Sequence, residues 1–568
     1  MAVAPSEFPP PFDPDSVIAA PTDPEDERIE VGIAIVGGGP AGLACANKLM
    51  QLLEDEPELT EKLGEVPVAV IEKGKVAGAH LLSGANVDPS ALTRLFPDLD
   101  PADWPPVYQE VTKDATYFLT GSKAFPLKPP PPNFRNHGNY VTSVARLGRW
   151  LAERAEEAGA YILTETAADK LLVSDRIVRG IRSGDKGRGR GGEELPNFEP
   201  GSDVVAKATV LAEGTIGHLT YAAMDYFDLR DGSDPQVWEL GVKEVWEVPK
   251  PLDRVIHTLG WPLRWSPRYK EAGGSFIYPM GEDKVCFGLV VGLDTTDATF
   301  SVHDALQLFK THPFIAKIIE GGKRVGWGAK TIPSGGYWAL PKRFSVPGML
   351  MAGDAAGMVN IAELAGVHYA MHAGMYAAEA IVESLKKDID SVNFESYDAM
   401  IRGSEIEKDL YRSRNMKQPL TKGLIFGGAM GSSMVATKGA FPGGHWKIED
   451  NADIPVFEGN AGEKYPKPDN EVTFNKLDSV FLSGNATRDD APNHVRVQTR
   501  VPREVAQTWV SMCPAQVYEI PEDQLESGAA DVDVHVTASN CVQCGAITAK
   551  GGRLTPPEGG SGPEYTRT

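Results

Sequence analysis

Uninterrupted apolar runs mark the first strands of this chain. The run V-G-I-A-I-V over 31–36 is typical of a strand inside a parallel sheet that is buried on both faces. It leads into G-G-G-P-A-G and a helical pattern from Ala41 to about Glu54. A second run, V-P-V-A-V-I-E, predicts the next strand and ends at Glu72. Strand, helix and strand in this order predict an α/β fold.

Gly37, Gly39 and Gly42 occupy the glycine positions of the G-x-G-x-x-G dinucleotide pattern. The first permits a tight turn, the second lets backbone approach a pyrophosphate, and the third lets helix pack closely on strand. The phosphates would lie at the helix N-terminus, where free N–H groups favour negative charge. Glu72 could accept hydrogen bonds from ribose hydroxyls. A glycine triplet also occurs in plain loops, so the flanking strands carry the prediction.

Two later segments favour FAD over NAD. A-T-V-L-A-E-G over 208–214 predicts a third strand that feeds a glycine turn. G-M-L-M-A-G-D-A-A-G over 348–357 has the strand-then-Gly-Asp form seen in flavoproteins, where an Asp bonds the ribityl chain and the following helix faces the flavin ring. Asp354 is the candidate, with Gly353 and Gly357 allowing close approach. The alternative is that Asp354 caps a helix.

Composition and charge narrow the possibilities. A chain of 568 residues, 42% of them hydrophobic, has room for two or three domains. Its net charge of −22 argues against general nucleic-acid binding. No apolar stretch reaches the roughly 18 residues of a spanning helix, so any membrane contact is expected to be peripheral. Residues 1–30 are acidic and proline-rich, unlike a signal or transit peptide, and are expected to form an ordered arm or a flexible leader.

Three of the five cysteines gather near the end of the chain, Cys513 upstream and then Cys541 and Cys544 in N-C-V-Q-C-G-A. Thiolates that converge from separate loops are typical of iron–sulfur and zinc sites. Both metals normally take four protein ligands. Ile547 stands where a ferredoxin-type pattern would place the next cysteine. An odd number of cysteines without a secretory signal favours reduced thiols over disulfides.

Ten further segments match one family in that family's order. They include H-G-N-Y-V, G-G-S-F-I-Y, C-P-A-Q-V-Y-E and P-E-G-G-S-G-P, and the full set covers 71–85, 137–141, 212–219, 257–263, 273–278, 290–294, 320–324, 465–469, 513–519 and 557–563. Along almost its whole length the sequence therefore resembles the electron transfer flavoprotein-ubiquinone oxidoreductase family.

The resemblance implies an oxidoreductase, an electron-transferring-flavoprotein dehydrogenase. It would accept electrons from reduced electron transfer flavoprotein and pass them through FAD and an iron–sulfur cluster to ubiquinone or another membrane quinone. The protein would be a monomer at the membrane surface. Because no signal or transit peptide is evident, we expect it on the cytoplasmic face of a prokaryotic inner membrane.

The resemblance also implies the domain organisation, α/β in its core and α+β overall. A Rossmann-like FAD domain of the glutathione reductase type would be interleaved with a β-rich quinone-binding domain and followed by a ferredoxin-like domain. The implied ranges are an acidic leader at 1–30, the FAD domain at 31–240 and 346–454 (with a membrane-facing segment), the quinone domain at 241–345 and the ferredoxin-like domain at 455–568.

Site residues follow from the same resemblance. Gly273 and Gly274 correspond to the glycine pair beside the quinone head group, for which an ordinary hairpin turn is the alternative. The further FAD contacts that the resemblance implies are Lys73, His80, Ser83, Gly84 and Asn360. The implied cluster ligands are Cys513, Cys541 and Cys544.

The sequence departs from the family in two places. With Ile547 in place of a thiolate, a 4Fe-4S or 3Fe-4S cluster on three cysteines, or an empty remnant, stays open. The family's aromatic-rich membrane segment is replaced by a glycine-rich run at 423–444, which predicts either a shallow insertion or a soluble cover over the quinone tunnel.

Two alternative functions stay open at this point. A flavin-dependent reductase of isoprenoid double bonds would share the FAD fold but lack the C-terminal cysteine domain. A zinc-stabilised docking domain would use the three thiols with His535. The remaining cysteines, Cys45 and Cys286, are expected to be small buried hydrophobic residues.

Overall fold

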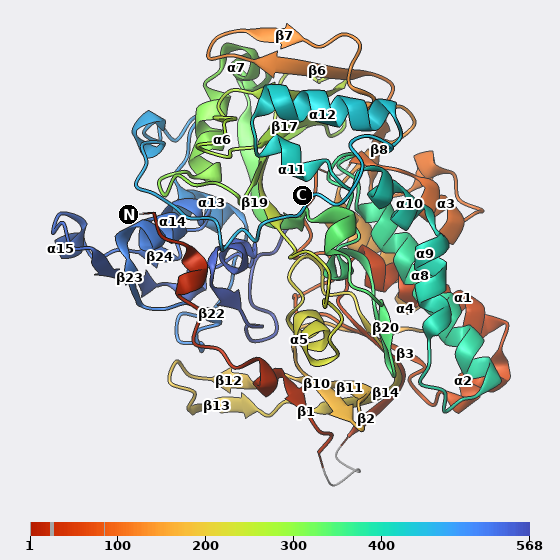
Figure 1. Cartoon of the computed structure of the whole chain (residues 1–568). Helices are drawn as coiled ribbons and strands as arrows, with labels where there is room; N and C mark the ends of the chain where they lie inside the picture. Colours follow the sequence, from red (N-terminus) through yellow and green to blue (C-terminus); the bar gives the residue numbers. More distant parts are fainter. Residues whose placement is uncertain (1, 23–27, 85) are drawn as a thin grey trace.

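The computed structural model describes residues 2–22, 28–84 and 86–568, so part of the predicted leader, 23–27, lies outside the described residues. Within these ranges the chain folds around a nine-stranded and a seven-stranded sheet. In Figure 1 the nine-stranded sheet forms the lower half of the molecule and the seven-stranded sheet rises above it. This mixed architecture agrees with the α/β fold predicted from the sequence.

The nine-stranded sheet carries the glycine loop. Its central strands β14, β2, β3 and β9 are parallel, and β21 continues the parallel set beside β14. Helix α1 (Pro40–Glu54) begins directly after the β2 strand and packs on α8 (Val367–Lys387). The helices approach closely because a Cβ at Gly374 would lie 2.0 Å from Ala41 O. The strands of this sheet are β1 (Ile18–Ala19), β10 (Ala168–Ser174), β11 (Ile177–Ser183), β14 (Asp203–Leu211), β2 (Ile29–Val36), β3 (Val68–Ile71), β9 (Tyr161–Leu163), β20 (Ser345–Val346) and β21 (Met349–Met351).

The described part of the N-terminal segment is an ordered arm. Strand β1 pairs with β10 at the edge of the nine-stranded sheet, and Val17 beside it is buried. Further upstream, Val3 N–H donates to Val456 O at 3.2 Å. Regular structure therefore starts before β2, because apolar residues of the N-terminal segment pair with strand β10 and with Val456, both far along the chain.

The seven-stranded sheet combines strands from two parts of the chain. Strands β6 and β7 come from the range assigned to the FAD domain, yet β6 pairs in parallel with β16. One face of the sheet packs against α6 (Val302–Lys310) through side chains such as Trp246 and Phe287. The strands, in sheet order, are β19 (Lys323–Pro333), β15 (Trp238–Glu247), β18 (Lys284–Gly292), β17 (Gly273–Pro279), β16 (Val255–Gly260), β6 (Asp114–Leu119) and β7 (Ala124–Pro126).

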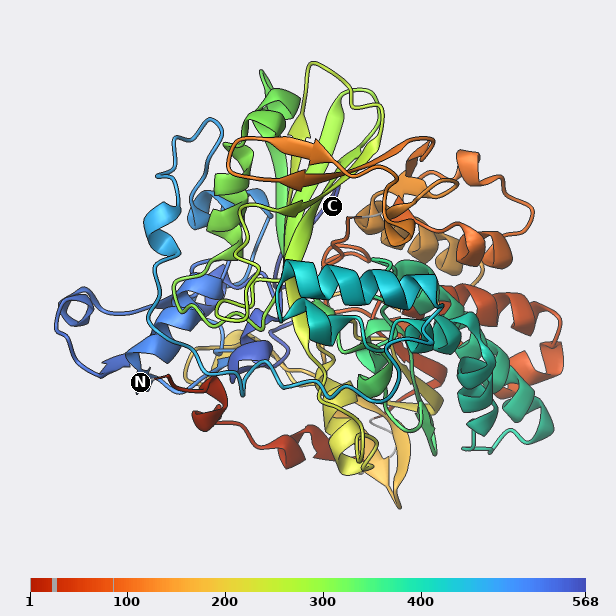
Figure 2. The same ribbon diagram turned by 45° about the horizontal axis from the view of Figure 1, so that its top comes forward.

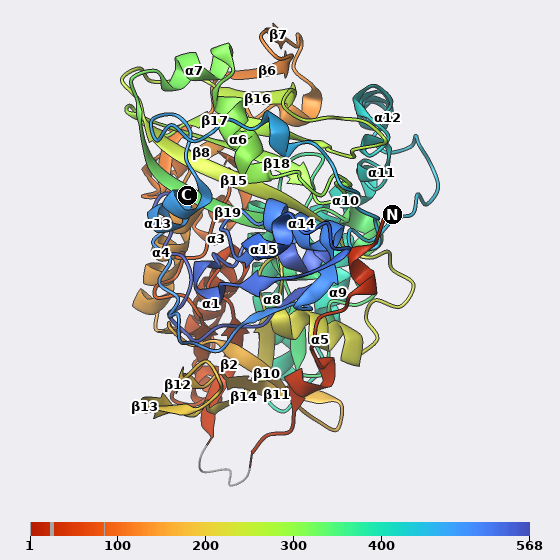
Figure 3. The ribbon, with the colours of Figure 1, turned by 90° about the vertical axis from the view of Figure 1, so that its left-hand side faces the viewer.

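The C-terminal segment packs against the seven-stranded sheet. It is built from α13 (Lys476–Leu482), α14 (Arg503–Met512) and short two-stranded ladders, and it lies toward the viewer in Figure 3. Trp509 of α14 is fully buried, and its indole N–H donates to Lys550 O at 2.7 Å. Its hydrophobic core is continuous with that of the sheet, so the segment is fixed beside it.

Candidate functional site

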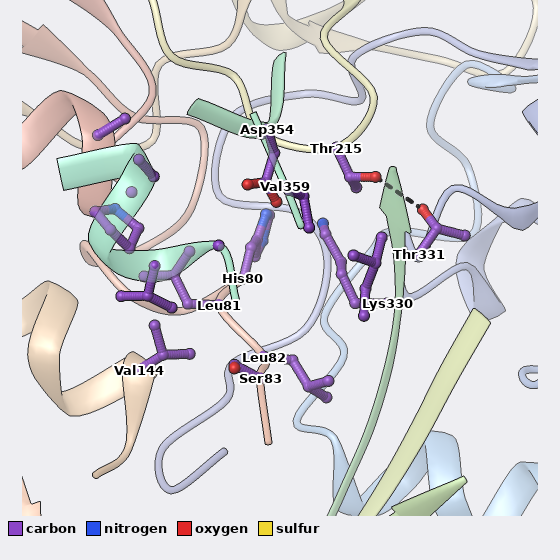
Figure 4. A pocket seen from close by; sticks show the side chains of 18 of the residues that line it. His80, Leu81, Leu82, Ser83, Val144, Thr215, Lys330, Thr331, Asp354 and Val359 are labelled. Atoms are coloured by element: carbon purple, nitrogen blue, oxygen red, sulfur yellow. Dashed lines mark hydrogen bonds between the residues drawn. The ribbon is translucent and has the colours of Figure 1, made fainter. Parts of the chain in front are cut away.

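A cavity of about 370 Å³ lies where the two sheets meet. Its wall takes in the glycine loop at 37–41, residues 80–84 and 86–88, one face of the seven-stranded sheet and residues 543 and 545 of the C-terminal segment. Figure 4 shows side chains around one space from the segment 80–83, from Lys330 and Thr331 of β19, and from Asp354 and Val359. The cavity is therefore built from the whole fold.

The glycine loop has room for a phosphate group only on its cavity side. Gly37 has φ of 110°, and a Cβ at Gly42 would lie 2.0 Å from Gly37 O, so both positions require glycine. A Cβ at Gly39 would meet only Leu81 Cδ2, at 3.7 Å. The space in front of Gly39 is thus open toward the cavity, as the close approach of a pyrophosphate requires.

Glu72 supports the loop from behind. Its Oε2 accepts from Gly38 N–H at 2.8 Å and its Oε1 accepts from Gly74 N–H at 2.6 Å. Each carboxylate oxygen keeps a further lone pair for a ribose hydroxyl. Glu72 also lines the cavity, so it can hydrogen-bond the loop and a bound nucleotide at the same time.

Three polar side chains face the centre of the cavity. Burial raises the pKa of Asp354 to about 6, and burial lowers the pKa of Lys330 to about 8. Burial also lowers the pKa of His80 well below its usual value, and His80 Nδ1 has no hydrogen-bond partner within the described residues. An orphaned buried nitrogen beside an acid and an amine fits a polar ligand such as a flavin. Figure 4 shows these three groups turned toward one another.

Asp354 does not cap a helix. The N-cap of the 3-10 turn η7 (Gly353–Ala356) is Ala352, and Asp354 lies in the first turn with its side chain in the cavity wall. The long helix expected to follow at once, α8, begins only at Val367. Val367 lines the cavity, so α8 still presents its N-terminus to it.

Other residues predicted to bind FAD divide into two groups. Lys73, Ser83 and Gly84 line the cavity, and Lys73 Nζ donates to Gln543 Oε1 at 2.6 Å. Asn360 does not line the cavity, and its side-chain oxygen accepts from Ser413 Oγ at 3.0 Å. The predicted residues that do not line the cavity are Gly42, Gly353, Gly357 and Asn360.

The cavity-facing side of the seven-stranded sheet is rich in glycine. Side chains that face each other across an antiparallel pair lie on the same side. The register pairs Gly241 with Val290, Lys243 with Gly288 and Phe276 with Gly288. Gly241 and Val290 form an apolar stretch of this wall that a flat ring could lie against, and Lys243 and Lys330 lie on the same face.

Two lysines on this face, Lys243 and Lys330, were not predicted from the sequence. Lys243 is buried, and its Nζ donates to Ser83 O at 2.7 Å. Burial lowers its pKa. Farther along the wall Tyr278 Oη and His257 Nε2 share a hydrogen bond of 2.8 Å. Sequence periodicity could place these residues on one face of a strand but could not show what that face covers.

Gly273 and Gly274 begin strand β17 and are not part of a hairpin turn. Gly274 pairs with Val290, so it lies on the same face as Phe276 and Tyr278, both of which line the cavity. Gly274 itself is not in the described lining. Gly274 therefore extends the cavity face of β17 beyond the enclosed part, whereas Gly273, the adjacent residue, lies on the opposite face of the strand.

The three C-terminal cysteines line one small cavity of about 20 Å³. Val517 N–H donates to Cys513 Sγ at 3.5 Å, and Gln543 N–H donates to Cys541 Sγ at 3.4 Å. Such bonds favour a charged sulfur and tune an iron–sulfur cluster. Burial raises the pKa of the Cys544 thiol to about 12, so this thiol would ionise on binding iron rather than alone at neutral pH.

Ile547 lines the same cavity. His535 is exposed, pairs with Glu519 in a strand ladder, and is not among the lining residues, so the zinc alternative finds no fourth ligand in it. Within the described ranges, no three His, Cys, Asp or Glu side chains converge closely enough to hold one metal ion. An iron–sulfur cluster does not need such convergence, because each thiolate binds a different iron and the thiols can lie spread around a cavity.

The two cavities adjoin. Gly545 and Leu554 line both of them. Thr331 of the flavin-side wall donates to Cys544 O from its N–H at 2.9 Å and from its hydroxyl at 2.8 Å. Its hydroxyl lies 3.3 Å from that of Thr215, as drawn in Figure 4. The residues that would hold a flavin and those that would hold a cluster therefore share the backbone around Gly545.

Comparison with known proteins identifies the family. Residues 238–332 match the family model described as ETF-QO, ubiquinone-binding, and residues 470–566 match the model described as electron transfer flavoprotein-ubiquinone oxidoreductase, 4Fe-4S. The mitochondrial electron transfer flavoprotein-ubiquinone oxidoreductase of Caenorhabditis elegans is 36% identical over 96% of this chain and 94% of its own. A probable counterpart from Acinetobacter baylyi is 34% identical over 95% of this chain and 99% of its own. The chain belongs to the electron transfer flavoprotein-ubiquinone oxidoreductase family.

Family membership confirms the predicted resemblance and supports FAD and an iron–sulfur cluster as the cofactors of this chain. A geranylgeranyl bacteriochlorophyll reductase-like protein from Thermoplasma acidophilum shares the fold, with a TM-score of 0.55 at 19% identity over 75% of this chain and 95% of that one. That likeness extends to the fold alone. The isoprenoid-reductase alternative lacks the cysteine domain, whereas the electron transfer flavoprotein-ubiquinone oxidoreductase 4Fe-4S model matches it here.

Proposed function

We propose that this chain takes electrons from reduced electron transfer flavoprotein and passes them to ubiquinone or another membrane quinone. The observation that carries the proposal is that the cysteine cavity, the flavin cavity and the face of the seven-stranded sheet adjoin one another in that order. The cysteine cavity shares Gly545 and Leu554 with the flavin cavity, and that cavity continues along the face of the sheet matched by the ubiquinone-binding model. FAD, when bound, supplies a centre that exchanges one or two electrons.

The chain's own residues position these groups. Gly39 leaves space for the pyrophosphate, and Asp354 and Lys330 offer an acceptor and a donor at the centre of the cavity. Lys73 and Lys330 both hydrogen-bond Gln543, which fixes the cysteine loop against the flavin site. The predicted site residues, including Gly273 and Gly274 for the quinone, remain proposals that these contacts support.

The test is a reconstituted assay with the full chain. Electron transfer flavoprotein, reduced in the absence of oxygen, should bleach the bound flavin, and an added short-chain ubiquinone should restore its colour. Electron paramagnetic resonance on the same sample follows the cluster. A chain that binds FAD but accepts no electrons from this donor would overturn the proposal.

We also propose that the protein is a monomer and that it binds peripherally to the cytoplasmic face of a prokaryotic inner membrane. Helix α12 (Leu424–Ala436) and the β6–β7 hairpin lie at the same end of the molecule (Figures 1 and 2). Ile425 is 91% exposed, and Phe426, Phe441 and Phe125 are each about half exposed. No helix in the described part of the chain is long and apolar enough to cross a bilayer.

Replacing Ile425 and Phe426 together by Glu is expected to weaken membrane binding at least about tenfold, because burying two such side chains contributes roughly 3–6 kcal/mol. Co-sedimentation with vesicles of phosphatidylcholine and phosphatidylglycerol measures the effect. Leu525→Glu is the control, since Leu525 is 52% exposed on α15 (Glu522–Leu525), in the C-terminal segment. Equal binding by both variants would place the contact elsewhere.

A further inference from the structure

We infer that the cluster of this chain is held by three protein thiolates, so that the iron at the corner facing Ile547 is exchangeable and the oxidised protein holds three irons. The inference rests on the proposed function, because it concerns the cluster that the function uses. It goes beyond the family, whose matching model is described as 4Fe-4S.

The chain has no other cysteine to complete the set. Of its five cysteines, Cys45 is buried in α1 in the core of the nine-stranded sheet. Cys286 is buried in β18 beside Tyr278. Neither lines the cysteine cavity, so each would need a rearranged core to reach it. Cys513, Cys541 and Cys544 are therefore the thiolates that the fold offers.

The hydrocarbon side chain of Ile547 occupies the place where a fourth cysteine ligand would lie. Ile547 is 4% exposed and lines the cavity together with the three thiols. A Cβ at Gly552 would lie 2.5 Å from Ile547 Cγ1, so this side chain is packed in place rather than free to swing aside. An isoleucine has no lone pair with which to bind iron.

The described residues that line the cavity offer little else. None of them is His, Asp or Glu, and the one oxygen-bearing side chain among them is the Tyr518 phenol. Iron ligands in such clusters are normally thiolates. An iron at the Ile547 corner would depend on water or hydroxide in a largely apolar site, where a polar ligand is poorly solvated.

The resulting oxidation step balances. A four-iron cluster with two Fe²⁺ and two Fe³⁺ gives one electron to ferricyanide and releases one Fe²⁺ from the corner without a thiolate. Three Fe³⁺ and the four sulfides stay on Cys513, Cys541 and Cys544. Ferricyanide is reduced to ferrocyanide, and no bond to a cysteine sulfur breaks.

The test compares the full chain with Ile547→Cys and Ile547→Ala, all purified without oxygen and then treated with ferricyanide. Iron and acid-labile sulfide are counted, and electron paramagnetic resonance is recorded before and after. Wild type and Ile547→Ala should end with three irons and the signal of an oxidised three-iron cluster. Ile547→Cys supplies a fourth thiolate, so it should keep four irons and stay silent when oxidised. FAD content should be equal in all three.

Two results would overturn the inference. One is a wild-type cluster that keeps four irons through oxidation, which would assign the fourth ligand to a group such as Tyr518 and would be checked with Tyr518→Phe. The other is protein that holds no iron before treatment. Donor-to-quinone turnover, measured on the same samples, separates the two proposals: a four-iron cluster with normal turnover ends this inference alone, whereas a three-iron cluster without turnover ends the proposed function alone.

Discussion

Gly39→Val should give a folded protein that binds FAD at least about tenfold more weakly than wild type. The position has room for a side chain, since a Cβ would meet only Leu81 Cδ2 at 3.7 Å, but that room is the approach to the pyrophosphate. Loss of a tightly bound ligand also lowers stability, by about 4 kcal/mol at a thousandfold excess over Kd. Absorbance of released flavin per chain and a thermal melt measure the two effects.

Two further substitutions test whether the loss of FAD comes from blocking the pyrophosphate. Gly42→Ala should fail to fold well whether or not FAD is added, because its Cβ would lie 2.0 Å from Gly37 O. Gly403→Val is the control, because no atom lies within 4 Å of a Cβ there. Wild-type flavin content in Gly39→Val would show that the phosphates lie elsewhere.

The local parts of the nucleotide site could be predicted from the sequence. Strand β2, the glycine loop, α1 and β3 follow one another within 43 residues, from Ile29 to Ile71, and each is specified by its own apolar pattern or glycines. Glu72 follows directly from the end of β3. Short-range order of this kind depends on backbone sterics and burial, which a single sequence expresses well.

The wall opposite the glycine loop could not be predicted in the same way. Gln543 hydrogen-bonds Lys73 across 470 positions of the chain, and β6 and β7 join a sheet whose other strands begin more than a hundred residues later. Alternation shows that Lys243 and Tyr278 share a face with their neighbours, but not what the face covers. Only the packing of the sheets decides that.

Asn360 was expected to contact FAD from the resemblance alone. Its side-chain oxygen accepts from Ser413 Oγ, 53 positions later in the chain, and from Ala362 N–H. The chain makes a turn at 360–365 before α8 starts, and a single sequence does not show which side chains such a turn brings together. Its role toward FAD stays a prediction.

The quinone is expected to lie on the glycine-rich face of the seven-stranded sheet, so filling that face should block quinone reduction and leave the flavin reducible. Gly274→Leu adds bulk at the predicted head-group position, but its Cβ would lie 2.9 Å from Thr258 O and would strain the strand. Val290 pairs with Gly274 and already lines the cavity. Val290→Phe therefore adds bulk at the same place without adding a Cβ at a glycine.

Both variants should reduce quinone-dependent turnover about tenfold or more, because the added side chain occupies the space in which the quinone ring would be held beside its electron donor. FAD content and flavin reduction by the donor should match wild type, and Val290→Ile, a change of one methylene, should retain most turnover. Stopped-flow spectroscopy with reduced electron transfer flavoprotein separates the two half-reactions. Loss of both half-reactions together with a lowered Tm would indicate misfolding in that variant. Unchanged quinone turnover in Gly274→Leu and Val290→Phe would mean that the head group binds outside this face, and the row of glycines would then serve only the close packing of the sheet against the flavin domain.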